Sequence, residues 1–350
     1  MKTVVLPTHN PALFNEAVGR AAELLKAGES VALPTETVYG LAANALDSRA
    51  VAQVFEVKGR PSHNPVIVHV ASVKMALRCV SGWPASADQL AAAFWPGPLT
   101  LVLPRSREIP DIVTAGGSTV GVRWPSHPFI QEVIRACGFP LAVPSANPAS
   151  AVSPTNAGHV LKSLGGKIPL IVDGGQAQVG IESTVLDLCS RPPRVLRPGM
   201  IDAAVLSAVV EMEGRAGNMR AGGGKPRDME DAPLRSPGQF VKHYAPKARL
   251  VIWEWRDETD LQSQVSNANF PKAGTNIIAH TKIPTGEGYG RVSVLPHDPA
   301  AYARAIYAEL HRCDDTGAQL IVVEALPAEA RWHGIADRLR RAGAVDLSHR

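Results

Sequence analysis

The stretch LPTETVYGLAANA at residues 33–45 decides how the rest of this sequence is interpreted. An apolar strand is expected to end at Pro34, and Thr35, Glu36 and Thr37 follow before a glycine turn. Hydroxyl and backbone N–H groups at the end of a strand are typical of ligand sites in α/β proteins. A single T-E-T is explained more simply as a capped turn. A ligand site therefore needs support from other stretches of the chain.

Short apolar stretches alternate with helical patterns through residues 1–210. Asn10 is expected to cap a helix that Gly28 ends, and Asp47 is expected to cap another. The predicted strands are 4–6, 30–33, 65–70, 100–103, 119–123, 140–144, 169–172 and 183–188. Mixed order of this kind indicates one large α/β domain.

A smaller α/β unit is predicted over residues 247–350. Its expected strands are 250–253, 276–280, 292–295 and 319–324, and its expected helices are 299–312 and 327–341. Residues 211–246 have no periodicity and are rich in glycine and charge, which predicts a linker. The linker ends in SPGQFVKHYAP, and a purely flexible spacer has no use for its two aromatics, Phe240 and Tyr244.

Composition excludes several classes of protein. With 45% hydrophobic residues and a net charge of only +4, the 350-residue chain is not disordered as a whole. No apolar run approaches the roughly 20 residues of a membrane helix, and the start is too short for a signal peptide, so a cytoplasmic protein without a membrane partner is expected. Neither C-x-x-C nor H-E-x-x-H occurs, which argues against a protein-held transition metal. The positive charge suits an anionic ligand but is too weak to indicate a nucleic-acid surface.

Two cations follow a predicted helix in KGRPSHNPVIVHV at residues 58–70. Lys58 and Arg60 precede Pro61, where a helix cannot easily continue, so both side chains can point into a loop. A compact ammonium beside a planar guanidinium suits neighbouring phosphate oxygens. Taken alone, the pair is explained as well by the preference of helix C-termini for basic residues. His69 lies inside a predicted strand, where a hydrogen-bonded core histidine is the default.

Two further positions add polar groups near strand ends. Arg123 interrupts an apolar strand, which is costly unless the guanidinium pairs with an anion. Ser145 and Asn147 follow strand 140–144 and could face the same pocket, although Ser-Asn alone indicates only a turn. GGGKP at 222–226 lacks the spacing of a phosphate-binding loop, and no G-x-S-x-G nucleophile motif occurs.

Taken together, six motifs in order resemble the YrdC/Sua5 family: LPTETVYGL, KGRP…NP, FWPGPLT, GVRWP, PSAN and IESTV. The HYAP segment and the second α/β unit resemble the two-domain Sua5 type. The resemblance covers essentially the whole chain. It implies a YrdC-like twisted mixed sheet with helices over 1–210, a linker over 211–246 and a smaller Rossmann-like C-terminal Sua5 domain over 247–350. Because a flexible spacer needs no aromatics, our hypothesis is that the SPGQFVKHYAP end of the linker folds over the nucleotide site as an active-site lid.

The resemblance also implies a nucleotidyltransferase reaction. L-Threonine, bicarbonate and ATP give threonylcarbamoyl-adenylate and pyrophosphate, with Mg²⁺ carried on the phosphates. A downstream transferase then uses the product to make N6-threonylcarbamoyladenosine at position 37 of tRNA, which makes tRNA an indirect partner. A threonine carbamate is already anionic, so the attack on phosphorus needs charge neutralisation and alignment more than a general base.

Matching the family's motifs residue by residue assigns three sets of site residues. The catalytic set is Lys58, Arg60, Ser145 and Asn147. The threonine-binding set is Thr37, His69, Arg123, Val143 and Ser183. The ATP-binding set is Lys58, Arg60, Asn64, Thr119, Ser145, Ser153, Arg197 and Tyr244. The linker departs from the family's common SPGMKYRHYAP, which leaves the contacts of the changed positions open.

Alternatives of other classes remain at this point. The domain could be an RNA-binding module, although the weak net charge argues against tight RNA binding. A carbamoyl transferase that carries this domain beside zinc fingers is disfavoured by the four scattered cysteines. A paralogue without synthase activity is disfavoured by the retained K-x-R and S-x-N pairs. SPGQFVKHYAP could also be a tether that docks the second domain instead of a lid.

Overall fold

A computed structural model describes residues 1–212 and 242–343. The first domain is built on a mixed ten-stranded sheet with the order β1-β8-β2-β3-β7-β4-β6-β5-β9-β10. The strands are β1 (Val4–Pro7), β2 (Val31–Leu33), β3 (Gly40–Asn44), β4 (Val68–His69), β5 (Leu99–Pro104), β6 (Thr119–Arg123), β7 (Leu141–Ala142), β8 (Leu170–Asp173), β9 (Thr184–Asp187) and β10 (Arg194–Arg197). The predicted α/β class with a mixed sheet is confirmed.

Eight helices accompany this sheet in the described part of the first domain. They are α1 (Pro11–Lys26), α2 (Ser48–Lys58), α3 (Val73–Cys79), α4 (Ala85–Phe94), α5 (Asp111–Thr114), α6 (Pro128–Cys137), α7 (Ala157–Leu164) and α8 (Ala203–Ser207). The side chains of Asn10 and Asp47 accept backbone N–H groups at the starts of α1 and α2, as expected from the sequence.

Two strands of the sheet, β3 and β10, were not predicted. The β3 sequence GLAAN has no β-branched residue, so propensity favours a turn there. Tertiary packing overrides this preference, because β3 lies in the middle of the sheet between β2 and β7 and its first four residues are buried. Any side chain at Gly40 would overlap Val143 on the neighbouring segment. The predicted strands 65–70 and 140–144 shrink to two residues each in β4 and β7.

The second domain has a four-stranded parallel sheet with the order β11-β14-β12-β13. Its strands are β11 (Arg249–Trp253), β12 (Thr275–Ala279), β13 (Arg291–Val294) and β14 (Leu320–Glu324), and its α-helices are α9 (Glu258–Asn267), α10 (Pro299–Asp315) and α11 (His333–Ala342). Helix α9 was not predicted. Helix α11 begins later than the predicted 327 because a 3-10 turn, Ala330–Trp332, precedes it.

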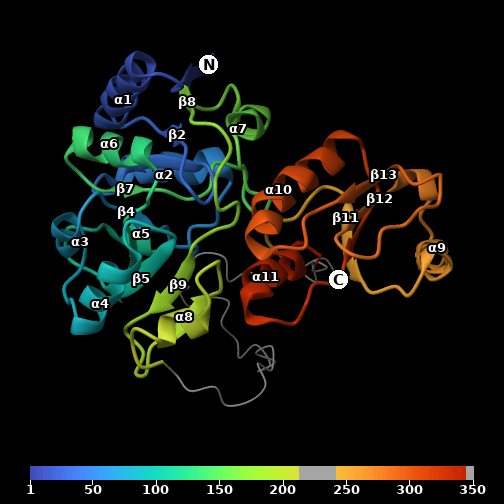
Figure 1. The fold of residues 1–350 in the computed structure, drawn as a ribbon. Helices are drawn as coiled ribbons and strands as arrows, with labels where there is room; N and C mark the ends of the chain where they lie inside the picture. The colour runs from blue at the N-terminus through green and yellow to red at the C-terminus, as the bar shows by residue number, and fades with distance from the viewer. Residues whose placement is uncertain (213–241, 344–350) are drawn as a thin grey trace.

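Helices α10 and α11 lie on the face of this sheet that is directed toward the first domain, and α9 lies on the opposite face (Figure 1). Val38, Val152 and Ile181 of the first domain share one apolar cluster with Tyr302 and Ile306 of α10. The two domains are therefore packed through a common apolar core. No helix within the described ranges is long and apolar enough to cross a membrane.

The predicted linker falls largely on residues 213–241, which lie outside the described residues. Of SPGQFVKHYAP, only Lys242 to Pro246 are described. The Ala245 N–H donates to the Ser150 carbonyl at 2.8 Å, and the His243 N–H donates to the Arg341 carbonyl at 3.2 Å. This short segment therefore contacts both domains.

Candidate active site

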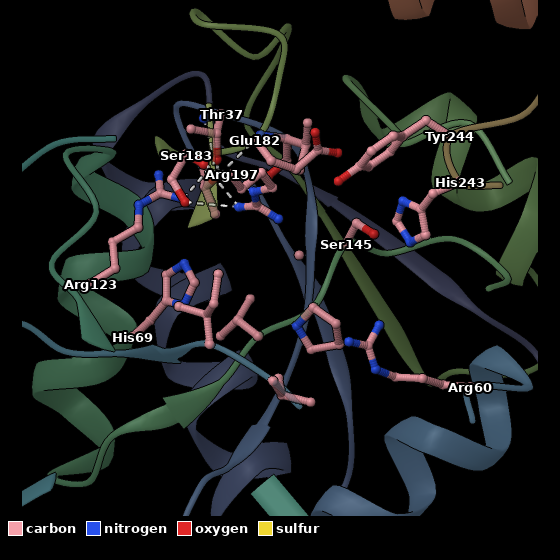
Figure 2. Close-up of a pocket in the computed structure, with 17 residues that line it drawn as sticks. Thr37, Arg60, His69, Arg123, Ser145, Glu182, Ser183, Arg197, His243 and Tyr244 are labelled. Atoms are coloured by element: carbon pink, nitrogen blue, oxygen red, sulfur yellow. Dashed lines mark hydrogen bonds between the residues drawn. The ribbon is translucent and has the colours of Figure 1, made fainter. Parts of the chain in front are cut away.

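A cavity opens in the first domain where several strands of the sheet end. The segment after β2, the ends of β4, β6 and β10, and the segments after β7 and before β9 all line it. His243 and Tyr244 close one side (Figure 2). Backbone hydrogen bonds fix the floor, since the Val143 N–H donates to the Ile67 carbonyl at 3.0 Å. Strand ends supply free backbone groups and diverging side chains, and this is why the cavity forms here.

Nine of the predicted site residues line this cavity, and five do not. Those that line it are Thr37, Arg60, His69, Arg123, Val143, Ser145, Ser183, Arg197 and Tyr244. Thr119 lines a smaller neighbouring cavity with Thr100 and Pro65. Lys58, Asn64, Asn147 and Ser153 are buried and make hydrogen bonds to or near the lining segments.

Lys58, at the end of α2, supports the Ser145–Asn147 turn from behind. Its ammonium donates to the Ser145 carbonyl at 2.6 Å and also to the Asn147 carbonyl. The Asn147 amide donates in turn to the Ala151 carbonyl at 2.8 Å. Burial, followed by repulsion from Arg60, holds the pKa of Lys58 well below its ordinary value. The described contacts of this lysine therefore order the turn that carries Ser145.

Arg60 lies beside the cavity and holds Asn64. Its guanidinium donates to the Asn64 side-chain oxygen at 2.7 Å and to the Pro65 carbonyl at 2.6 Å. Arg197, across the cavity, donates to the Ser183 carbonyl at 3.0 Å and to the Ser183 hydroxyl at 3.1 Å. Burial lowers the pKa of both guanidiniums. Their positive charges are thus incompletely compensated, and an anion in the cavity would stabilise both.

Arg123, at the end of β6, has a partner that the sequence did not reveal. Its Nη2 lies 2.6 Å from the Glu36 carboxylate, and its Nη1 donates to the Thr37 hydroxyl at 3.0 Å. Burial tends to raise the pKa of Glu36, but the Arg123 charge and hydrogen bond bring it below the ordinary value. The anion that Arg123 needs is therefore supplied in part by the T-E-T stretch itself. A guanidinium has five N–H groups, so donors remain for a ligand.

His69 is the last residue of β4. It is buried beside the cavity, and its Nδ1 has no hydrogen-bond partner among the described residues. Burial, followed by the charge of Arg123, lowers its pKa well below the ordinary value, so the ring is neutral. The Tyr244 hydroxyl is likewise buried at the cavity, next to Arg197. Such polar atoms beside a cavity are suited to bind a ligand.

Three cavity residues with polar side chains were missed as site residues in the sequence: Glu182, Thr35 and His243. Thr35 and Glu182 lie within the quoted TETVYGL and IESTV stretches, so their position in those motifs was the available signal. Within the described residues, no group of three or more histidine, cysteine, aspartate or glutamate side chains is arranged to hold a metal ion.

The comparisons with known proteins agree along the chain. Residues 23–199 match the Sua5/YciO/YrdC family model, described as "Telomere recombination", and residues 200–344 match "Threonylcarbamoyl-AMP synthase, C-terminal domain". The threonylcarbamoyl-AMP synthase of Pyrococcus abyssi is 39% identical over 93% of this chain and 94% of its own length. The Bacillus subtilis enzyme of that name is 37% identical over 93% and 92%.

A solved structure is similar over both domains. The crystal structure of P. abyssi Sua5 complexed with L-threonine superimposes with a TM-score of 0.85 at 33% identity, covering 97% of this chain and 98% of that chain. Family models over both domains, relatives similar along nearly the whole length and a shared two-domain fold lead to one conclusion. The chain belongs to the Sua5/YrdC family, in its two-domain Sua5 form.

Proposed function

We propose that this protein is a threonylcarbamoyl-AMP synthase, which converts L-threonine, bicarbonate and ATP into threonylcarbamoyl-adenylate and pyrophosphate. The observation that carries the proposal is the convergence of Arg60, Arg123 and Arg197 from three separate segments on one cavity lined by hydroxyl groups. The relatives named above bear this enzyme name, and one of them was crystallised with L-threonine.

The cavity has two ends with different chemistry (Figure 2). We assign the end with Arg123, Thr37 and His69 to threonine, together with Val143 and Ser183. The remaining N–H groups of Arg123 can bind the carboxylate, and the neutral His69 ring offers an unpaired nitrogen. The proposed threonine-binding set thus combines a charged group for the carboxylate with polar side chains and the apolar Val143.

The opposite end suits the nucleotide and its phosphates. Arg60 supplies positive charge there, Ser145 and Tyr244 supply hydroxyls, and Arg197 lies between this end and Ser183 (Figure 2). Lys58 and Asn147 fix the turn that carries Ser145, and Asn64 is held by Arg60. Ser153 lies one hydrogen bond behind the cavity, and Thr119 borders the smaller cavity. We propose that these residues align the α-phosphorus for attack by the carbamate.

No side chain of the cavity is needed as a strong base. The carbamate of threonine is already anionic, so charge neutralisation is the main requirement. The Glu182 carboxylate of the cavity lining and the nearby Glu36 carboxylate are both paired with arginines. These residues therefore do not offer a resident metal site, and Mg²⁺ would arrive on the phosphate oxygens of ATP, where it offsets their charge.

The product defines the next step. Threonylcarbamoyl-adenylate is a mixed anhydride that water hydrolyses, so a transferase must consume it promptly. We propose that this partner is the tRNA threonylcarbamoyl transferase and that tRNA is modified through it. We propose that the reaction takes place in the cytoplasm.

The test is pyrophosphate release from ATP that depends on both L-threonine and bicarbonate. Omission of either substrate should abolish the release, and mass spectrometry should detect the adenylate. Chelation of Mg²⁺ should stop turnover. Pyrophosphate release that is independent of threonine, or tRNA binding without any turnover of ATP, would refute the proposal.

A further inference from the structure

A buried arginine of the second domain binds a residue that lines the candidate site. Arg338 of α11 is about 1% exposed, and its Nε donates to the Glu182 carboxylate at 2.7 Å. Glu182 itself lines the cavity. Tyr307 of α10 donates to the same carboxylate oxygen at 3.1 Å. The second domain thus supplies two of the partners of a carboxylate that belongs to the first domain's site.

The same guanidinium also fixes two backbone positions. Its Nη2 donates to the Glu182 carbonyl at 3.2 Å, and its Nη1 donates to the Pro198 carbonyl at 2.8 Å. Glu182 precedes Ser183, and Pro198 follows Arg197. Each bonded carbonyl therefore belongs to a residue adjacent to one of the predicted substrate-binding residues.

Two more predicted site residues contact this pair. The Ser153 hydroxyl donates to the other Glu182 carboxylate oxygen at 2.6 Å. The Arg338 guanidinium lies over the Tyr244 ring, 5.2 Å from its centroid. Ser153 and Tyr244 therefore contact the Glu182–Arg338 pair, Ser183 is one peptide bond from it, and Arg197 adjoins Pro198, whose carbonyl Arg338 binds.

Backbone packing keeps this geometry tight. A side chain at Gly334 of α11 would lie 2.7 Å from the Gly199 carbonyl oxygen, and one at Gly180 would overlap the backbone of α10. Both helices thus approach loops of the first domain without an intervening side chain. Burial tends to raise the pKa of Glu182, but Arg338 and Arg197 bring it to about 2, so the carboxylate is ionised.

We propose that Arg338 is a positioning residue, through which the second domain sets the backbone on either side of Ser183 and Arg197 and so completes the substrate site. This inference rests on the proposed function. A buried charge must be paired, and a fork with several donors is required where a carboxylate and two carbonyls are bound at once. An ammonium at this position would balance the charge but could not reach these three acceptors together with the Asp337 carboxylate, which Nη1 also binds at 2.9 Å.

The test is therefore Arg338→Lys in the full chain. The thermal midpoint should stay close to that of the wild type, because Glu182 keeps a cationic partner. The value of kcat/KM for threonine and for ATP should fall by about tenfold or more, because small displacements of binding groups are costly. Asp315→Asn is the matched control. It removes an ion pair to Lys162 that also joins the domains but lies half exposed and outside the cavity, so kinetics should be unchanged.

A folded Arg338→Lys variant with wild-type kinetics would overturn the inference and leave Arg338 as a charge partner only. If Arg338→Lys does not fold, Tyr307→Phe decides instead. It removes one hydrogen bond to Glu182 but keeps the ring, and unchanged kcat/KM would overturn the inference.

Calorimetric titration with L-threonine separates this result from the proposed function. Weaker binding to Arg338→Lys than to the wild type supports positioning without requiring turnover. Wild-type protein that neither binds threonine nor releases pyrophosphate defeats the proposed function and the inference with it. Active wild type with an equally active Arg338→Lys variant defeats the inference alone.

Discussion

The strand ends of the two sheets differ: those of the first domain surround a cavity, and those of the second are bound by a side chain of the protein. In the first domain, strand ends surround a cavity lined by the arginines Arg60, Arg123 and Arg197 and by several hydroxyl groups. In the second domain, Glu324 at the end of β14 accepts the backbone N–H groups of His280 and Thr281 at 2.6 and 2.9 Å, and also the N–H of Lys282. In the second domain, the Glu324 side chain therefore satisfies the backbone N–H groups at the edge of the sheet.

The difference shows what makes a strand edge a ligand site. Carboxyl ends of strands offer unpaired polar groups in both domains. In the second, backbone hydrogen bonds outweigh burial and lower the pKa of Glu324. In the first, burial lowers the pKa of Arg60 and Arg197, so their charges are incompletely compensated. A buried polar or charged group without a partner costs free energy. The edge of the second sheet is therefore stable without a ligand, whereas the cavity of the first domain favours a bound anion.

The largest effect at the cavity of the first domain is expected when L-valine is supplied as the substrate instead of L-threonine. Valine would leave polar groups of the site without a partner for the missing hydroxyl, a discrimination that can reach about 10⁴-fold in kcat/KM. Serine, which lacks only a methyl group, should lose about 1 kcal/mol of binding. Pyrophosphate release measured with each amino acid checks this. Similar rates with valine and threonine would mean that the hydroxyl is not recognised.

Arg60→Ala should cause the next largest loss. It deletes a charge beside the cavity, and one such electrostatic contact contributes about 2.7–4 kcal/mol to the transition state, or 10²–10³ in kcat. Lys58→Ala should also remove most activity, because the turn carrying Ser145 loses its support. Circular dichroism should show an intact fold in both variants. Near wild-type turnover of both at saturating ATP would contradict the assignment.

Glu324→Gln tests the edge of the second sheet, where Glu324 binds backbone N–H groups. The amide places N–H donors against backbone N–H donors, so the free energy of unfolding should fall by about 1–3 kcal/mol. Turnover per folded molecule should not change, because Glu324 lies outside the cavity. Urea unfolding and kcat measured on the same preparation separate the two effects. A loss of kcat without a loss of stability would mean that the second edge also acts in the reaction.

An effect of pH on stability is expected at the junction between the two domains. The rings of His159 and His311 stack with centroids 3.9 Å apart across the domains. Burial lowers the pKa of both, with His159 at about 3, so the folded protein keeps them neutral while the unfolded chain binds protons near pH 6.5. Stability should be constant above about pH 7 and fall as pH drops from about 6.5 toward 3.

His159→Phe keeps an aromatic ring in the stack but removes one titrating group. Thermal midpoints of this variant, measured across the same pH range, should decline less steeply than those of the wild type. Equal slopes in the two proteins would show that the histidine stack does not contribute to the acid sensitivity.

Local pattern alone determined much of this protein. Alternation of apolar stretches and helical periodicity predicted two α/β units, because burial on one face requires that spacing. The helix end at Lys58 predicted a cation pair beside a loop, and the order of six motifs indicated the family and its site residues.

Only the tertiary structure decided the partners of the buried charges. Glu36 lies in the segment after β2 and Arg123 at the end of β6, and Glu182 and Arg338 are 156 residues apart in different domains. Strand β3 formed against its propensity because neighbouring strands enclose it. Periodicity specifies which side chains are buried, but the partner of a buried charge depends on which distant segments pack together, and no local pattern carries that information.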